Sequence, residues 1–141
     1  MTKLKNNQTT SFFSYKNDER ELVELGQFLR ETMDYRVERE WYIIFSKGTG
    51  EYAGFTANAV VDSVNYKVRN PDLMLIDKKT KKLVLVIEID GLVHHIHFAD
   101  TEQRNEEYFL AGVPLLVIDK EEVKTTLIDY LNKQVRKRLG I

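Results

Sequence analysis

Three carboxylate residues occupy positions where a predicted sheet would bring them together. Asp72 follows Pro71 at the start of one apolar segment, and Glu88 and Asp90 close another segment that ends sixteen and eighteen residues further on. Burying carboxylates beside an apolar run is unfavourable unless a cation accompanies them. Mg²⁺ prefers one or two protein carboxylates, with water and phosphate oxygens as its other ligands. These residues therefore predict a divalent metal site, whose chemistry would be water activation and neutralisation of phosphate charge.

The predicted strand pairing explains how the three side chains would meet. Side chains alternate between the faces of a strand, so Glu88 and Asp90 point the same way, about 7 Å apart, while the neighbouring isoleucines point to the other face. In a hairpin closed by residues 78–82, Asp72 lies opposite about position 88, allowing for a bulge. The structural alternative is that Asp72 caps a turn and that Glu88 and Asp90 leave the sheet at a solvent-exposed edge.

Three histidines and one arginine follow these carboxylates in the sequence. His94 lies four residues after Asp90 and could orient water, shuttle protons or contact phosphate, because the pKa of histidine is near neutrality. His94, His95 and His97 could alternatively form a zinc site, although three histidines this close seldom reach one ion without help from elsewhere. His95 and His97 could equally be surface or packing residues. Arg104, on a following helix, could pair with a site carboxylate or a phosphate, or lie exposed.

Hydrophobic spacing, caps and turn residues predict the elements that position these side chains. They are a helix over 19–33, strands over 56–69, 72–77, 83–90 and 113–118, a helix over 101–111 closed by Gly112, and a last helix capped by Asp119 with Glu122. Segment 34–45 fits either a strand or an extension of the first helix.

The order of these elements predicts the fold class. The apolar strand over 83–90 should be central and covered on both faces. The step from residue 83 to 118 is long enough for a parallel strand-helix-strand crossover. We therefore expect an α/β fold with a mixed sheet of about four or five strands flanked by helices, in the order α-β-β-β-α-β-α.

Length and composition are those of one ordinary globular domain. The chain has 141 residues, of which 43% are hydrophobic and 30% charged. We expect residues 1–16 to be partly disordered and residues 17–141 to form a single domain. The sequence contains no apolar run of ~18 residues, no long apolar segment near the N-terminus that would suggest a secretory signal, and no cysteine. These features predict a cytoplasmic protein with no membrane partner and no disulfide or thiolate metal site.

The formal net charge of −1 argues against a protein coated in positive charge, but basic residues are clustered. Each cluster is either a solvated surface or a set of contacts to a nucleic-acid backbone. The first comprises Lys78, Lys79, Lys81 and Lys82, and the second comprises Lys133, Arg136, Lys137 and Arg138.

The sequence Glu88 to His94 has the form E-x-D-G-x-x-H, followed by Arg104, Gly112 and an apolar strand over 113–118. This arrangement resembles the PD-(D/E)XK nuclease superfamily, and more narrowly the small bacterial domains related to very-short-patch repair endonucleases. The resemblance covers residues 70–118, about a third of the chain. It implies a restriction-endonuclease-like fold and DNA cleavage that depends on Mg²⁺, with Mn²⁺ as a substitute. Asp72 and Glu88 would then be metal ligands.

The chain departs from the superfamily pattern in two places. The usual Lys is Asp90 here, so Asp90, His94 or a second metal would have to position the nucleophilic water. The glutamate that the superfamily carries on the preceding helix has three possible matches, at positions 19, 21 and 24. Glu21 is favoured because it borders the apolar face of the predicted helix.

The leading functional hypothesis is a metal-dependent deoxyribonuclease that uses Asp72, Glu88 and Asp90 as metal-binding carboxylates. The lysines of the turn and Arg104 would contact the DNA backbone, which carries no sequence information. A double-strand cut would require a homodimer or another partner.

Two alternatives stay open. One is an inactive nucleic-acid-binding or interaction module of the same fold. The other is a ribonuclease, in which aromatic side chains would stack on bases, although core packing would explain most of them. These aromatic residues are Phe12, Phe13, Tyr15, Trp41, Tyr42, Tyr52 and Phe55.

Overall fold

The structure is a computed structural model, and it describes residues 19–58 and 61–141, apart from the side chains of residues 93 and 94. The helices and strands in chain order are α1 (Glu19–Thr32), β1 (Arg36–Glu38), β2 (Tyr42–Ser46), β3 (Tyr52–Thr56), β4 (Tyr66–Arg69), β5 (Leu73–Ile76), β6 (Leu83–Asp90), α2 (Leu92–Ile96), α3 (Phe98–Ala111), β7 (Leu115–Asp119), a 3₁₀-helix (Lys120–Glu122) and α4 (Leu127–Leu139).

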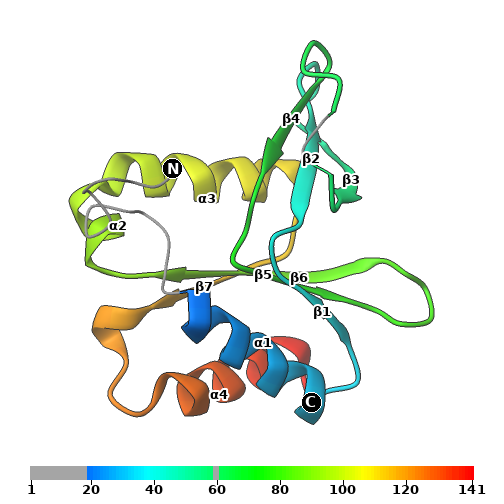
Figure 1. The fold of residues 1–141 in the computed structure, drawn as a ribbon. Helices are drawn as coiled ribbons and strands as arrows, with labels where there is room; N and C mark the ends of the chain where they lie inside the picture. Colours follow the sequence, from blue (N-terminus) through cyan, green and yellow to red (C-terminus); the bar gives the residue numbers. More distant parts are fainter. Residues whose placement is uncertain (1–18, 59–60) are drawn as a thin grey trace.

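The main sheet has four strands in the order β1-β5-β6-β7. The β6–β7 pair is parallel and the other two pairs are antiparallel. Helices α1 and α4 cover one face of this sheet, and α3 lies on the other (Figure 1). Strand β6 is central and covered on both faces, and the crossover to β7 is parallel, as predicted. The predicted mixed α/β fold is therefore confirmed.

The two faces of the main sheet are built differently. The face toward α1 and α4 is a continuous apolar core, and burying each of its large side chains contributes roughly 1.5–3 kcal/mol. Its members include Leu25, Leu29, Leu73, Leu75, Leu85, Ile87, Ile89, Ile118, Leu131 and Val135. The face toward α3 has a smaller core around Met74, Val86 and Tyr108. Alternation along β6 therefore places Glu88 and Asp90 on the α3 side.

A second sheet, in the order β3-β2-β4, rises on the same side of the main sheet as α3 (Figure 1). Two short connections join the sheets, residues 39–41 between β1 and β2 and residues 70–72 between β4 and β5. Glu40 adopts a positive φ of 66° in the first connection. The side chain of Asn70 donates a hydrogen bond to the carbonyl of Trp41 over 2.7 Å, so the two connections are tied to each other.

The strand predicted over 56–69 is wrong for most of its length. The carboxylate of Asp62 accepts hydrogen bonds from the backbone N–H groups of Val64 and Asn65. This local bonding makes a turn, so the strand begins only at Tyr66. Strand β3 precedes it and was not predicted, and segment 34–45 forms most of two strands rather than a helical extension.

The last helix begins later than predicted. Asp119 does act as a cap, but its side chain accepts from the N–H of Glu121 and caps only the 3₁₀-helix. The side chain of Thr126 accepts from the N–H of Asp129 and begins α4. Hydrophobic spacing alone predicted one helix after Asp119. The two caps instead divide this segment into a 3₁₀-helix and α4.

The segment after β6 also contains more helix than predicted. Helix α2 was not anticipated, and α3 begins at Phe98, three residues before the predicted start. Gly112 ends α3 in the left-handed conformation, with a φ of 79°, as predicted.

The expectation of disorder over residues 1–16, and the aromatic residues Phe12, Phe13 and Tyr15, lie outside the described residues. No helix in the described part of the chain combines the length and the apolarity needed to cross a membrane.

Candidate functional site

The β5–β6 hairpin brings Asp72 beside Glu88. Leu73 pairs with Ile87, and a register shift lies between residues 75 and 76, so the predicted pairing and its bulge are confirmed. One carboxylate oxygen of Asp72, Oδ2, accepts a 2.7 Å hydrogen bond from the backbone N–H of Ile89. Asp72 is thus anchored to the central strand at the level of the other two carboxylates.

Glu88 is buried with a raised pKa. Its side chain accepts a 3.0 Å hydrogen bond from the hydroxyl of Tyr108, and the residue is 6% exposed. Burial and the charge of Asp72 raise the pKa of Glu88 to about 8, although Arg104 and the Tyr108 hydrogen bond act in the opposite direction. Glu88 therefore holds a proton at neutral pH unless a further cation approaches it.

Asp90 is buried against Arg104. Arg104 Nη1 donates to Asp90 Oδ1 over 3.0 Å and Nη2 donates to Oδ2 over 2.8 Å, which makes a two-pronged ion pair. Burial alone would lower the pKa of Arg104, but Asp90 and Glu88 outweigh it and raise that pKa. Of the alternatives left open for Arg104, the structure shows the pair with a site carboxylate. The residue is buried and not exposed on the helix, and its two-pronged bond goes to Asp90.

Arg104 is shared unequally between two carboxylates. It lies 3.9 Å from Glu88 Oε1, in addition to its close pair with Asp90. Burial raises the pKa of Glu88 most, and the charge of the neighbouring Asp72 raises it further. Two adjacent hard oxygen donors fit the ligand preference of Mg²⁺, which takes few protein carboxylates. Among the described residues, no group of three or more His, Asp or Glu side chains is arranged to hold a metal ion.

The histidines occupy different environments. His95 Nε2 lies 2.9 Å from the carboxylate of Asp119, and this hydrogen bond raises the pKa of His95. Burial opposes ionisation of Asp119, but the bonds from His95 and from the N–H of Glu121 outweigh it and lower that pKa. His97 lies on the surface, 3.9 Å from Asp100. The side chain of His94, the predicted catalytic histidine, lies outside the described residues.

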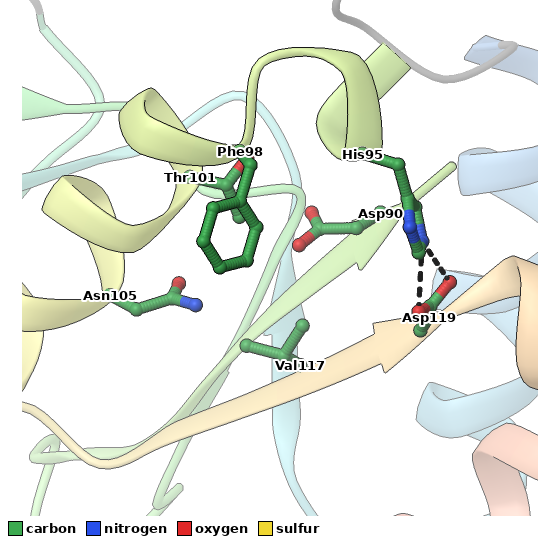
Figure 2. A pocket seen from close by; sticks show the side chains of 7 residues that line it. All are labelled: Asp90, His95, Phe98, Thr101, Asn105, Val117 and Asp119. Atoms are coloured by element: carbon green, nitrogen blue, oxygen red, sulfur yellow. Dashed lines mark hydrogen bonds and ion pairs between the residues drawn. The ribbon is translucent and has the colours of Figure 1, made fainter. Parts of the chain in front are cut away.

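A cavity of about 190 Å³ opens beside Asp90, between the segment that carries α2 and α3 and the ends of β6 and β7. Figure 2 shows the ring of Phe98 and the side chains of Asn105 and Asp90 around this space. Its lining residues are Asp90, His95, Phe98, Thr101, Asn105, Val117 and Asp119.

Two residues of this region were not predicted from the sequence. Asp119 lies opposite Asp90 in the register of the parallel strands β6 and β7. From the sequence it was interpreted only as a helix cap. Its place at the carboxyl end of a parallel neighbour of β6 was a usable indication. Tyr108 lies four residues after Arg104 and so on the same face of α3, which indicates that both side chains reach β6.

Glu21, the favoured glutamate of the first helix, contacts a different partner. Lys120 Nζ donates to Glu21 Oε1 over 2.8 Å. A Cβ added to Gly91 would lie 3.9 Å from Lys120 Cδ, so this pair lies near the end of β6. Helix α1 packs on the opposite face of the sheet from α3, and in the described contacts Glu21 pairs with Lys120 rather than with a site carboxylate.

The lysines of the turn lie at the other end of the β5–β6 hairpin. Asp77 accepts hydrogen bonds from the backbone N–H groups of Lys79 and Thr80 and shapes the turn, and Lys78 pairs with Asp34 over 3.1 Å. Five residues of β6 separate position 83 from Glu88, about 17 Å at the rise of a strand. The lysines do not join the carboxylate cluster, and the C-terminal basic cluster lies on α4, which packs on the apolar face.

Comparisons with known proteins gave no relative for this chain: no family model, curated protein or solved structure matches it. The resemblance to the nuclease superfamily stays a prediction from the motif.

Proposed function

We propose that this protein is a metal-dependent nuclease that hydrolyses phosphodiester bonds in DNA. The observation that carries the proposal is the buried Glu88 beside the half-buried Asp72, because burial and the charge of Asp72 raise the pKa of Glu88 to about 8. A raised pKa caused by burial and a like charge is characteristic of functional sites. A divalent cation would relieve this repulsion and would also attract a phosphodiester.

In this proposal Asp72 and Glu88 hold Mg²⁺ or Mn²⁺. When bound, the ion would supply neutralisation of phosphate charge and activation of water. Tyr108 orients Glu88 through its hydroxyl, and the backbone N–H of Ile89 orients Asp72. Arg104 fixes Asp90, so Asp90 shapes the site as part of an ion pair instead of serving as a third ligand.

A second candidate is a module of the same fold that binds nucleic acid without cleaving it. The Asp90–Arg104 pair favours this candidate, because it occupies the position where the superfamily carries a lysine. A ribonuclease stays open as a variant of the first candidate, and competition between DNA and RNA would decide it.

The test is incubation of plasmid, linear, single-stranded and branched DNA with Mn²⁺ or Mg²⁺, comparing the parent with Asp72→Ala and Glu88→Ala. Glu106→Ala is the matched control, because it removes an exposed carboxylate from α3. We expect cleavage by the parent and the control, and loss of cleavage in both site variants. Calorimetry should show metal binding that depends on Asp72 and Glu88. Metal-independent DNA binding with no cleavage of any substrate would favour the second candidate.

A further inference from the structure

The cavity beside Asp90 has a composition different from that of the carboxylate cluster. Its charged walls are already neutralised within the chain. Arg104 balances Asp90, and His95, when protonated, balances Asp119. Because these charged side chains already pair with each other, the cavity provides no unbalanced charge to attract a phosphate or a metal ion. It suits an uncharged ligand with a polar edge.

The remaining walls define the shape of that ligand. Phe98 is 61% exposed, and Figure 2 shows its ring beside the cavity, with Val117 below it on β7. Asn105 Oδ1 accepts from Arg104 Nε over 3.1 Å and from Nη2 over 2.8 Å, which leaves the amide nitrogen directed toward the cavity (Figure 2). An aromatic face beside a fixed amide donor suits a flat heterocycle that carries hydrogen-bond acceptors.

We propose that this cavity binds one nucleobase of the substrate, stacked on Phe98 and hydrogen-bonded at its edge by Asn105. The inference rests on the proposed nuclease function, because the phosphate of that nucleotide would lie at Asp72 and Glu88. A volume of about 190 Å³ is below the range of ~300–1,000 Å³ found for drug-sized ligands and fits one base.

This assignment names the substrate class. A base inside a duplex is stacked on both sides and cannot offer a face to Phe98 unless it leaves the helix. Single-stranded, frayed or flapped DNA presents such a base without that cost. The protein should therefore prefer DNA with an unpaired nucleotide at the cleavage position over a fully paired duplex.

The experiment compares two exposed phenylalanines of the same helix. Phe98→Ala removes the stacking face, and Phe109→Ala is the matched control, because Phe109 is 79% exposed and does not line the cavity. Binding of a fluorescent oligothymidine and of a duplex of equal length is measured by polarisation, with Ca²⁺ as a hard cation able to bridge carboxylate and phosphate. Stacking of one base on an aromatic ring predicts a loss of about 5- to 150-fold in single-strand affinity for Phe98→Ala. Duplex affinity and the Phe109→Ala variant should change little.

The outcomes separate this inference from the proposed function. Equal effects of the two variants, or equal losses for single strand and duplex, would overturn the base site, and Mn²⁺-dependent cleavage could still be present. If Phe98 controls single-strand binding but no DNA is cut with Mn²⁺, the base site stands and the nuclease function fails. If the parent binds neither DNA, both are overturned.

Discussion

Two clusters of charged residues include side chains of helix α3, and they shift the pKa of a carboxyl group in opposite directions. Near its C-terminal half, Glu107 accepts from Arg69 over 2.8 Å and from Lys67 over 2.9 Å, so two cations surround one carboxylate. Toward its N-terminal half, Arg104 pairs with Asp90 and lies 3.9 Å from Glu88, and the charge of Asp72 acts on Glu88 as well. The first cluster holds the pKa of Glu107 down to about 2, chiefly through the Arg69 bond, and the second raises the pKa of Glu88 to about 8.

The difference shows what each cluster contributes. A carboxylate with surplus cations stabilises the fold, because its ionised form is favoured by folding. A buried carboxyl group whose pKa is raised makes the fold less stable as pH rises above the ordinary pKa, so folding does not account for Glu88. This contrast is the physical reason for assigning function to the Glu88 cluster and a structural role to the Glu107 cluster.

The largest predicted effect comes from removing the guanidinium that pairs with Asp90 and lies near Glu88. Arg104→Met leaves Asp90 buried without its partner, and we expect it to lower the free energy of unfolding by about 3–5 kcal/mol. Urea denaturation at pH 7 measures the change. Arg69→Met is the comparison, and it should cost less because Lys67 still pairs with Glu107. Equal losses of unfolding free energy in Arg104→Met and Arg69→Met would contradict the proposed difference between the two clusters.

Glu88→Gln should stabilise the protein in a pH-dependent way. The folded-state pKa of about 8 lies above the ordinary 4.5, so the folded protein keeps a proton that the unfolded chain releases, and stability falls as pH rises from 4.5 to 8. The amide cannot ionise, and its oxygen can still accept from Tyr108. Urea denaturation should show little difference at pH 5 and a gain on the order of a few kcal/mol at pH 9. A difference that does not vary with pH would contradict the raised pKa.

Glu107→Gln should act in the opposite direction. The folded-state pKa of about 2 lies below the ordinary 4.5, so the stabilisation by Glu107 is present above pH 4.5 and is lost as pH falls toward 2. The pair is partly exposed, so we expect a loss of only about 1–2 kcal/mol at pH 7. Thermal unfolding between pH 3 and 7 should show parent and variant converging at the acidic end.

The smallest effect concerns the His95–Asp119 pair at the edge of the cavity. Asp119→Asn removes the hydrogen bond that raises the pKa of His95, so that pKa should fall, as measured by NMR titration of the ring. The stabilisation from this pair is complete below pH 6.5 and is lost as pH rises through the raised folded-state value. Asp100→Asn is the matched control and should leave the His95 titration unchanged.

The sequence was sufficient for the parts of the fold that local chemistry determines. The apolar strand ending at Asp90, the hairpin register beside Asp72 and the stop at Gly112 follow from alternation, turn length and backbone freedom, and all three were predicted. The turn at Asp62 was not predicted, because the alternating apolar residues around it indicated a strand. The hydrogen bonds from the backbone to the Asp62 side chain were not considered.

The site was predicted less completely, because the balance of charge depends on which side chains meet in the folded structure. The sequence indicated that Glu88 and Asp90 share a face, but it could not show that Arg104 is already committed to Asp90. Nor could it show that Asp119 and His95 meet, since that pair depends on the β6–β7 register and on helix α2, which was not predicted.

The hydrogen bond from Asn70 to the carbonyl of Trp41 has a mechanical consequence. In the described part of the chain, two strand-to-strand connections join the sheets, residues 39–41 and 70–72, and this bond ties them together. Asp72 belongs to the second connection. On its other side, Asp72 is held by the backbone N–H of Ile89 on the central strand. The Asp72 carboxylate is therefore fixed from two directions, and its repulsion with Glu88 cannot be relieved by a shift of one connection alone.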